Sequence, residues 1–91
     1  MTVKVKYDFN SDGSLQYKSW RNEKGEAHRE FSPALEWSNG TRTWHKNGFL
    51  HREDGPAVIL KDGNHEYYLN GTFYTKEDYW KEIKRLKKER E

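Results

Sequence analysis

The heptapeptide "HREDGPA", which begins at His51, holds the side chains in this sequence that could most readily do chemistry. Histidine and carboxylate groups bind zinc and act as general acids and bases, so His51 with Asp54 or Glu53 could form such a site. The alternative interpretation is mechanical. Gly55 would permit a corner, Pro56 would fix φ at the start of a strand, and Asp54 would cap the turn through its side chain.

Recurrence favours the mechanical interpretation. An upstream segment, "KGEAHREFSPA", repeats the heptapeptide at a distance of 23 residues, and a catalytic site is seldom copied at a repeat period. That copy has Phe31-Ser32 in place of Asp-Gly. The change would destroy a catalytic or metal site but would only weaken a turn. We expect His51→Ala to cost stability, and either His51 or Arg52 to pair with a carboxylate. The predicted structural residues are Gly48, His51, Arg52, Asp54, Gly55, Pro56 and Gly71.

Several features argue against an enzyme. The sequence contains no cysteine, no serine in a G-x-S-x-G context, and no glycine-rich loop leading into a helix. Adjacent carboxylates such as Glu53 and Asp54 would point to opposite faces of a strand. Zinc needs three or four protein ligands, and the His-Arg copies do not supply a full set. We therefore predict no catalytic residues, no metal and no cofactor.

The 23-residue spacing extends beyond the heptapeptide and predicts the fold. Asn-Gly and Asp-Gly pairs between apolar runs are strong β-hairpin signals, because both central turn residues take positive φ. The pairs are Asn39-Gly40, Asn47-Gly48, Asp62-Gly63 and Asn70-Gly71. We predict a mainly β (β+α) protein, in which an antiparallel meander of about three 23-residue hairpin repeats forms a domain over 1–74 with units near 12–38, 39–61 and 62–74. Strands are expected near 3–8, 14–20, 26–31, 34–38, 41–46, 49–52, 57–61, 64–69 and 72–74.

The C-terminal segment, residues 75–91, predicts one basic amphipathic α-helix. Thr75 and Asp78 form a capping-box-like pair at its start. Tyr79, Ile83 and Leu86 fall on one stripe, which we expect to pack on the sheet.

Composition bounds the class of protein. The chain has 91 residues with a net charge of +2, and aromatic residues make up 15%. Leu, Ile, Val and Phe together number only 15, which predicts a thin core that a partner copy would help to cover. We expect a homodimer. No apolar run is long enough to span a membrane, and cysteine is absent, so we expect a cytoplasmic protein with no membrane partner.

Charge and aromatic residues indicate a binding surface. Residues 1–75 carry ten basic and ten acidic residues, so the whole net charge lies in the C-terminal segment. Basic residues beside aromatic rings on a sheet are typical of single-stranded nucleic-acid binding. The candidate contacts for RNA or a partner are Lys81, Lys84, Arg85, Lys87, Lys88, Arg90, Arg42 and Lys46. The alternatives are an ordinary solvated helix face and rings that form the core.

Residues 39–57 match the pattern N-G-x3-[W/Y]-x2-N-G-x2-H-R-x-D-G-P-A in full. This pattern resembles the "HREDGPA" repeats of bacterial and phage proteins, which are related in form to MORN-type hairpin repeats. A chain of this size with a basic helical end is similar to small phage accessory proteins that act against host defences. Some of these are RNA-dependent inhibitors of antiviral ribonuclease toxins. The resemblance implies a non-catalytic protein in the host cytoplasm that binds RNA, a host defence protein such as a ribonuclease toxin, or both, and inhibits it. The alternative is a purely protein-binding MORN-like module with no nucleic-acid role.

Overall fold

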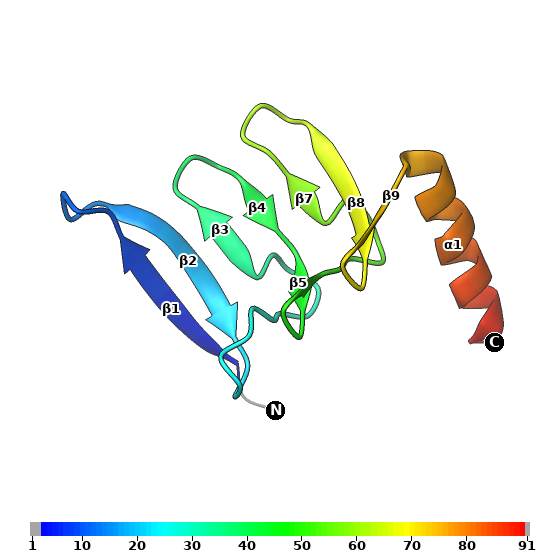
Figure 1. The fold of residues 1–91 in the computed structure, drawn as a ribbon, viewed down its shortest axis with the longest axis horizontal. Helices are drawn as coiled ribbons and strands as arrows, with labels where there is room; N and C mark the ends of the chain where they lie inside the picture. The colour runs from blue at the N-terminus through cyan, green and yellow to red at the C-terminus, as the bar shows by residue number, and fades with distance from the viewer. Residues whose placement is uncertain (1–2, 91) are drawn as a thin grey trace.

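Nine short strands and one helix follow one another along residues 3–90, the part of the chain that the computed structural model describes (Figure 1). The strands are β1 Lys4–Phe9, β2 Leu15–Arg21, β3 Leu35–Trp37, β4 Arg42–Thr43, β5 His45–Lys46, β6 Phe49–Leu50, β7 Val58–Ile59, β8 His65–Leu69 and β9 Thr72–Tyr74, and the helix is α1 Lys76–Glu89. The prediction of a mainly antiparallel β protein closed by one C-terminal helix is confirmed. No helix in this part of the chain is long and apolar enough to cross a membrane.

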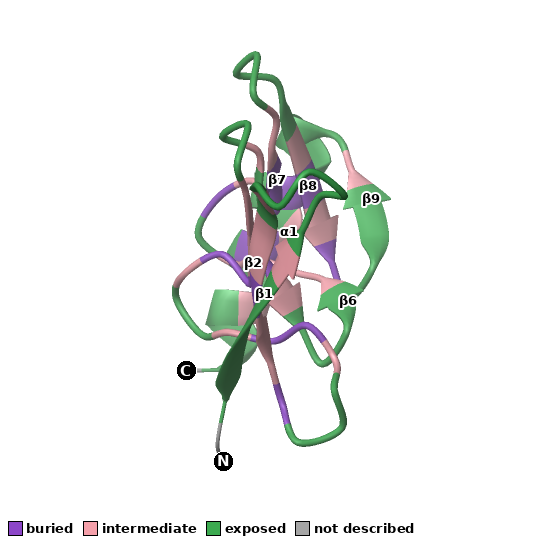
Figure 2. Cartoon of the chain, turned by 90° about the vertical axis from the view of Figure 1, so that its left-hand side faces the viewer, coloured by how far each residue is buried: buried purple, intermediate pink, exposed green. Residues whose placement is uncertain are grey.

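The strands form one seven-stranded antiparallel sheet in the order β1-β2-β3-β4-β7-β8-β9, and β5 and β6 form a separate pair. The chain leaves the large sheet at Trp44, whose N–H donates to the carbonyl of Ala57 while its own carbonyl accepts from the His51 N–H. The strand expected over 41–46 is therefore divided at this tryptophan. The molecule is flat, with extents of 48 × 33 × 17 Å, and β1 forms its free edge (Figures 1 and 2).

The turns fall into two classes, which corrects one expectation. Asn47-Gly48 and Asn70-Gly71 have positive φ at both residues, as predicted, with values of 49° and 88° in the first pair. At Gly40 and Gly63 only the glycine has positive φ, so the expectation of two positive φ values is wrong there. These turns contain one more residue, and the preceding Asn or Asp side chain accepts the backbone N–H two residues further on.

The strand expected over 26–31 is also wrong. Only one isolated bridge, between Arg21 and Ala27, remains there. The next backbone donors bond to different partners, because His28 N–H donates to Trp20 and Arg29 N–H donates to His45. Phe31 then takes φ of 67°, which ends the extended conformation. This segment is part of the loop between β2 and β3.

The helix packs on the end of the sheet as its apolar stripe predicted. Thr75 caps it by accepting the Asp78 N–H at 3.2 Å. The main apolar cluster consists of Tyr67 and Leu69 from β8 with Tyr79 and Ile83 from α1, and Leu86 packs against it. The core is thin, and Figure 2 shows how few segments are buried. This placement brings the C-terminal end of α1 back beside the heptapeptide.

Candidate nucleic-acid interface

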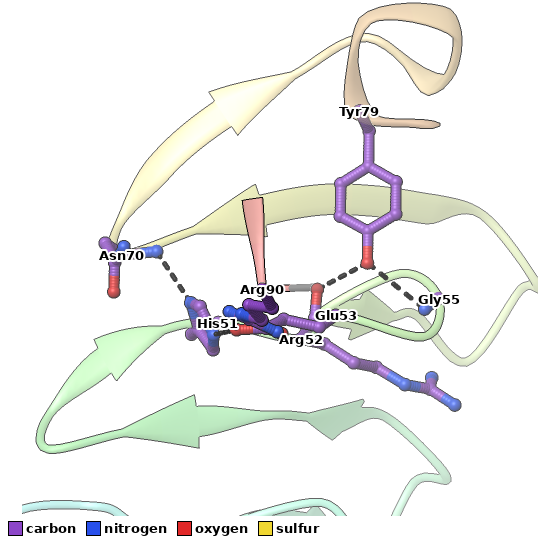
Figure 3. A network of polar contacts seen from close by, with 7 residues as sticks. All are labelled: His51, Arg52, Glu53, Gly55, Asn70, Tyr79 and Arg90. Atoms are coloured by element: carbon purple, nitrogen blue, oxygen red, sulfur yellow. Dashed lines mark hydrogen bonds and ion pairs between the residues drawn. The ribbon is translucent and has the colours of Figure 1, made fainter. Parts of the chain in front are cut away.

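His51 ties two neighbouring hairpins together and is fully occupied in doing so (Figure 3). Its Nδ1 accepts the backbone N–H of Asn70 at 2.9 Å, and its Nε2 lies 2.9 Å from the Glu53 carboxylate. This pattern gives the ring a neutral tautomer with the proton on Nε2, donated to Glu53. His28 makes the equivalent bond to the N–H of Asn47, also at 2.9 Å. Both nitrogens of His51 therefore have partners, which fits a structural role.

The contacts of Arg52 account for the spacing of the other heptapeptide residues, Asp54, Gly55 and Pro56, around its side chain. Its guanidinium lies 3.9 Å from the centre of the Trp44 ring, donates to Asp54 at 2.9 Å and donates to the Pro56 carbonyl at 3.0 Å. Gly55 leaves room for this side chain, because a Cβ there would lie only 3.1 Å from the guanidinium carbon. Asp54 thus holds the arginine, in place of the turn cap that the sequence suggested. Both His51 and Arg52 have carboxylate partners, where we expected only one.

The same stack occurs one repeat period earlier. Arg29 lies 3.8 Å from the centre of the Trp20 ring and donates to the Pro33 carbonyl at 3.3 Å. Its carboxylate neighbour is Glu36, at 3.8 Å, because Phe31 occupies the position equivalent to Asp54. The two His-Arg-Glu loops, residues 28–32 and 51–55, are therefore built by the same contacts.

Tyr79 of α1 ends this row of stacks. Tyr67 lies one repeat period after Trp44, but the position equivalent to Arg52 is Thr75, so no arginine is available to stack on this ring. The Tyr79 ring lies 4.8 Å from the Tyr67 ring in its place. The Tyr79 hydroxyl donates to the Arg52 carbonyl and accepts the Gly55 N–H at 3.2 Å. Burial raises the pKa of this phenol. The helix thus covers the second loop, a contact that the first loop lacks among the described residues.

Arg90 fixes the other end of the helix to the same loop. It donates to both oxygens of Glu53, at 2.7 and 3.2 Å. This hydrogen-bonded ion pair, with a smaller contribution from His51, lowers the pKa of Glu53 to about 2, against the opposing effect of burial. Glu53 therefore stays ionised over the whole physiological range.

A groove of about 390 Å³ lies between the two His-Arg-Glu loops. Its lining residues are His28, Arg29, Glu30, Phe31, Trp44, His45, Lys46, His51, Arg52, Glu53, Asp54 and Lys87. Trp44 is buried, and its indole N–H has no acceptor among the described residues, so the ring is held by stacking. Phe31 is different, because 92% of its surface is exposed.

The groove brings together two of the eight predicted contact residues. Lys46 comes from β5 and Lys87 from α1. Arg85 pairs with Glu82 and Glu89 along the helix, and Arg90 holds Glu53, so both arginines are used within the chain. The other four are exposed and lie outside the groove lining: Lys81, Lys84, Lys88 and Arg42.

Most of the aromatic rings that the sequence placed beside basic residues stack within the protein. Trp37 lies 4.5 Å from Tyr17, and Trp20 and Trp44 are covered by arginines. Sequence reasoning did not identify Phe31 as a site residue, although its departure from the heptapeptide was visible. It did not identify the two hydrogen bonds of Tyr79 either, since no local signal announces them.

Within residues 3–90 no cluster of three or more histidine, cysteine or acidic side chains is arranged to hold a metal ion. Comparisons of the chain with protein-family models, curated proteins and solved structures return no match.

Proposed function

We propose that this protein is a non-catalytic binding protein that takes single-stranded RNA in the groove between its two His-Arg-Glu loops. The main support for the proposal is the conformation and exposure of Phe31. A bulky side chain with φ of 67° is strained, and this one is 92% exposed, so burial in the monomer does not repay the strain. Such strain is typical of a residue held ready for a ligand.

The surroundings of Phe31 define the chemistry of that ligand. Lys46 and Lys87 line the same groove as the exposed Phe31 ring. A ring on which a base can stack, beside cations that can contact the phosphate backbone, is the usual arrangement for single-stranded nucleic acid. No ion pair to either lysine exists among the described residues. A groove of about 390 Å³ fits one or two nucleotides and not a duplex.

The biological role follows from the resemblance of the heptapeptide. We interpret residues 12–74 as three MORN-like hairpin units, and the chain as a small phage-type accessory protein of the host cytoplasm. In this role, bound RNA would join the protein to a host defence protein such as a ribonuclease toxin, which it would inhibit. The alternative, a purely protein-binding module, is favoured by the exposed apolar side chains of β1.

Fluorescence anisotropy with a labelled single-stranded RNA tests the proposal. We compare the wild type with a double variant in the groove, Lys46→Gln and Lys87→Gln, because each lysine should contact one phosphate. The slope of log K against log salt should fall in magnitude by about 1.4, or about 0.7 for each lost contact. The matched control is Lys24→Gln with Lys61→Gln, which removes the same charge at two exposed turns outside the groove. Equal weakening in both double variants, or no binding by the wild type, would refute the groove.

Phe31→Ala separates stacking from charge. Loss of one base-aromatic stack costs about 1–3 kcal/mol, so affinity should fall by about 5- to 150-fold with the salt slope unchanged. Copurification offers an independent check, because protein carrying RNA has a raised ratio of absorbance at 260 to 280 nm that RNase treatment lowers.

A further inference from the structure

The free edge of the sheet exposes apolar side chains outside the groove. β1 places Val5, Tyr7 and Phe9 on one face, and 44, 52 and 61% of their surfaces are exposed. β1 has six residues, whereas β9 at the other edge of the seven-stranded sheet has three, so β1 is the longer free edge. The bulge in the β1–β2 ladder lies on β2, where Gln16 is skipped, so β1 itself is continuous. Such an edge is open to pairing with another strand.

We propose that β1 pairs antiparallel with β1 of a second copy, joining two seven-stranded sheets across a two-fold axis at Tyr7. In this register Tyr7 faces Tyr7 of the second copy, and Val5 faces Phe9 of the second copy on the same side of the sheet. On the opposite side, Lys6 faces Asp8 of the second copy, and the symmetry makes this pair twice. The strand is therefore complementary to itself in both apolar contacts and charge.

The charges select this register over its neighbour. A two-fold axis at Lys6 would keep the apolar residues on one side and would pair Lys4 with Asp8 of the second copy. It would also place Lys6 opposite Lys6 of the second copy, which is unfavourable and which the axis at Tyr7 avoids. Within one copy, Asp8 Oδ1 lies 3.9 Å from the Lys6 ammonium group. A lysine from the second copy would add a further charge contact to the same carboxylate.

This proposal is independent of RNA binding, because β1 contributes no residue to the groove. The predicted contact is small, since it rests on one strand from each copy, so we expect a dimer with a dissociation constant on the order of micromolar. The groove could function with or without the dimer, and the two proposals fail separately.

Charge exchange tests the register directly. Lys6→Asp gives a strand with two acids, and Asp8→Lys gives a strand with two lysines, so each variant should repel itself. Mixed in equal amounts, they should form a heterodimer, because every exchanged charge then faces its opposite. Sedimentation velocity of RNase-treated protein at rising concentration should show a wild-type dimer, two variants with dissociation constants raised at least tenfold, and recovery in the mixture.

The matched control is Lys61→Asp, which makes the same charge change at an exposed turn away from β1 and should dimerise as the wild type does. A wild type that stays monomeric at hundreds of micromolar, a Lys6→Asp variant that dimerises normally, or a mixture that stays monomeric would overturn the proposal. Hydrogen exchange on the wild type gives a test that needs no variant. Amides of β1 should gain protection as the protein concentration rises, and protection that does not change with concentration would also overturn it.

Discussion

Tyr79→Phe removes one oxygen atom from the centre of the structure and should destabilise the protein strongly. The hydroxyl is fully buried, donates to the Arg52 carbonyl and accepts the Gly55 N–H. Phenylalanine keeps the ring contact with Tyr67 but leaves a buried carbonyl and a buried N–H without partners. Each orphaned group costs about 1–3 kcal/mol, so we expect a loss of about 2–4 kcal/mol in the free energy of unfolding.

Urea denaturation followed by tryptophan fluorescence measures this loss, because Trp20, Trp37 and Trp44 report on the sheet and Trp80 reports on α1. For a domain of this size, each kcal/mol lowers the melting temperature by about 4–8 °C, so the variant should melt roughly 10–25 °C below the wild type.

Tyr67→Phe is the matched control. It makes the same chemical change in the neighbouring ring, whose hydroxyl has no hydrogen bond among the described residues, and it should cost less than about 0.5 kcal/mol. Equal stability of Tyr79→Phe and the wild type would show that the helix is not bonded to the second His-Arg-Glu loop.

Three further predictions concern single residues. Glu53 has a pKa lowered to about 2 from 4.5, so its contribution to stability is present above pH 4.5 and lost as the pH falls toward 2. The gap between wild type and Glu53→Gln, on the order of 1–2 kcal/mol after allowance for partial exposure, should shrink over that range, and a gap independent of pH would contradict the pair with Arg90. Gly48→Val should cost at least about 1 kcal/mol, because φ is 88° there, and an unchanged melting temperature would refute the turn. Phe31→Gly should stabilise the protein by about 0.5–1 kcal/mol while weakening RNA binding, and a loss of stability would show that Phe31 has a packing role.

Local signals in the sequence predicted the local structure. Asn47-Gly48 forms the expected turn because both residues tolerate positive φ, and Thr75 starts the helix because its hydroxyl can accept a free backbone N–H. The prediction of a strand over 26–31 was wrong because the conformation of this segment depends on contacts that are distant in sequence. An extended segment becomes a strand only when a neighbour pairs with it, and Arg29 finds its partner in His45, on a distant hairpin.

The candidate site likewise has one part that local sequence predicts and one part that depends on tertiary structure. A structural role for the heptapeptide could be predicted from the sequence, because Arg52 makes its hydrogen bonds to residues only two and four positions further along the chain. The groove needs tertiary structure. Lys46 and Lys87 line the same groove only because α1 packs against the second His-Arg-Glu loop. Tyr79 and Arg90 hold the helix in that position. Nothing in the spacing of these four residues along the sequence indicates that they meet.

An NMR titration of the isotopically labelled protein with a short single-stranded RNA tests directly whether RNA binds in the groove. We expect the chemical-shift changes to be concentrated at residues 28–31, 44–46 and 51–54 and at Lys87, with the largest change at Phe31. Binding in the groove would be contradicted by an absence of changes at hundreds of micromolar RNA, or by changes confined to β1 or to the exposed lysines of α1 outside the groove.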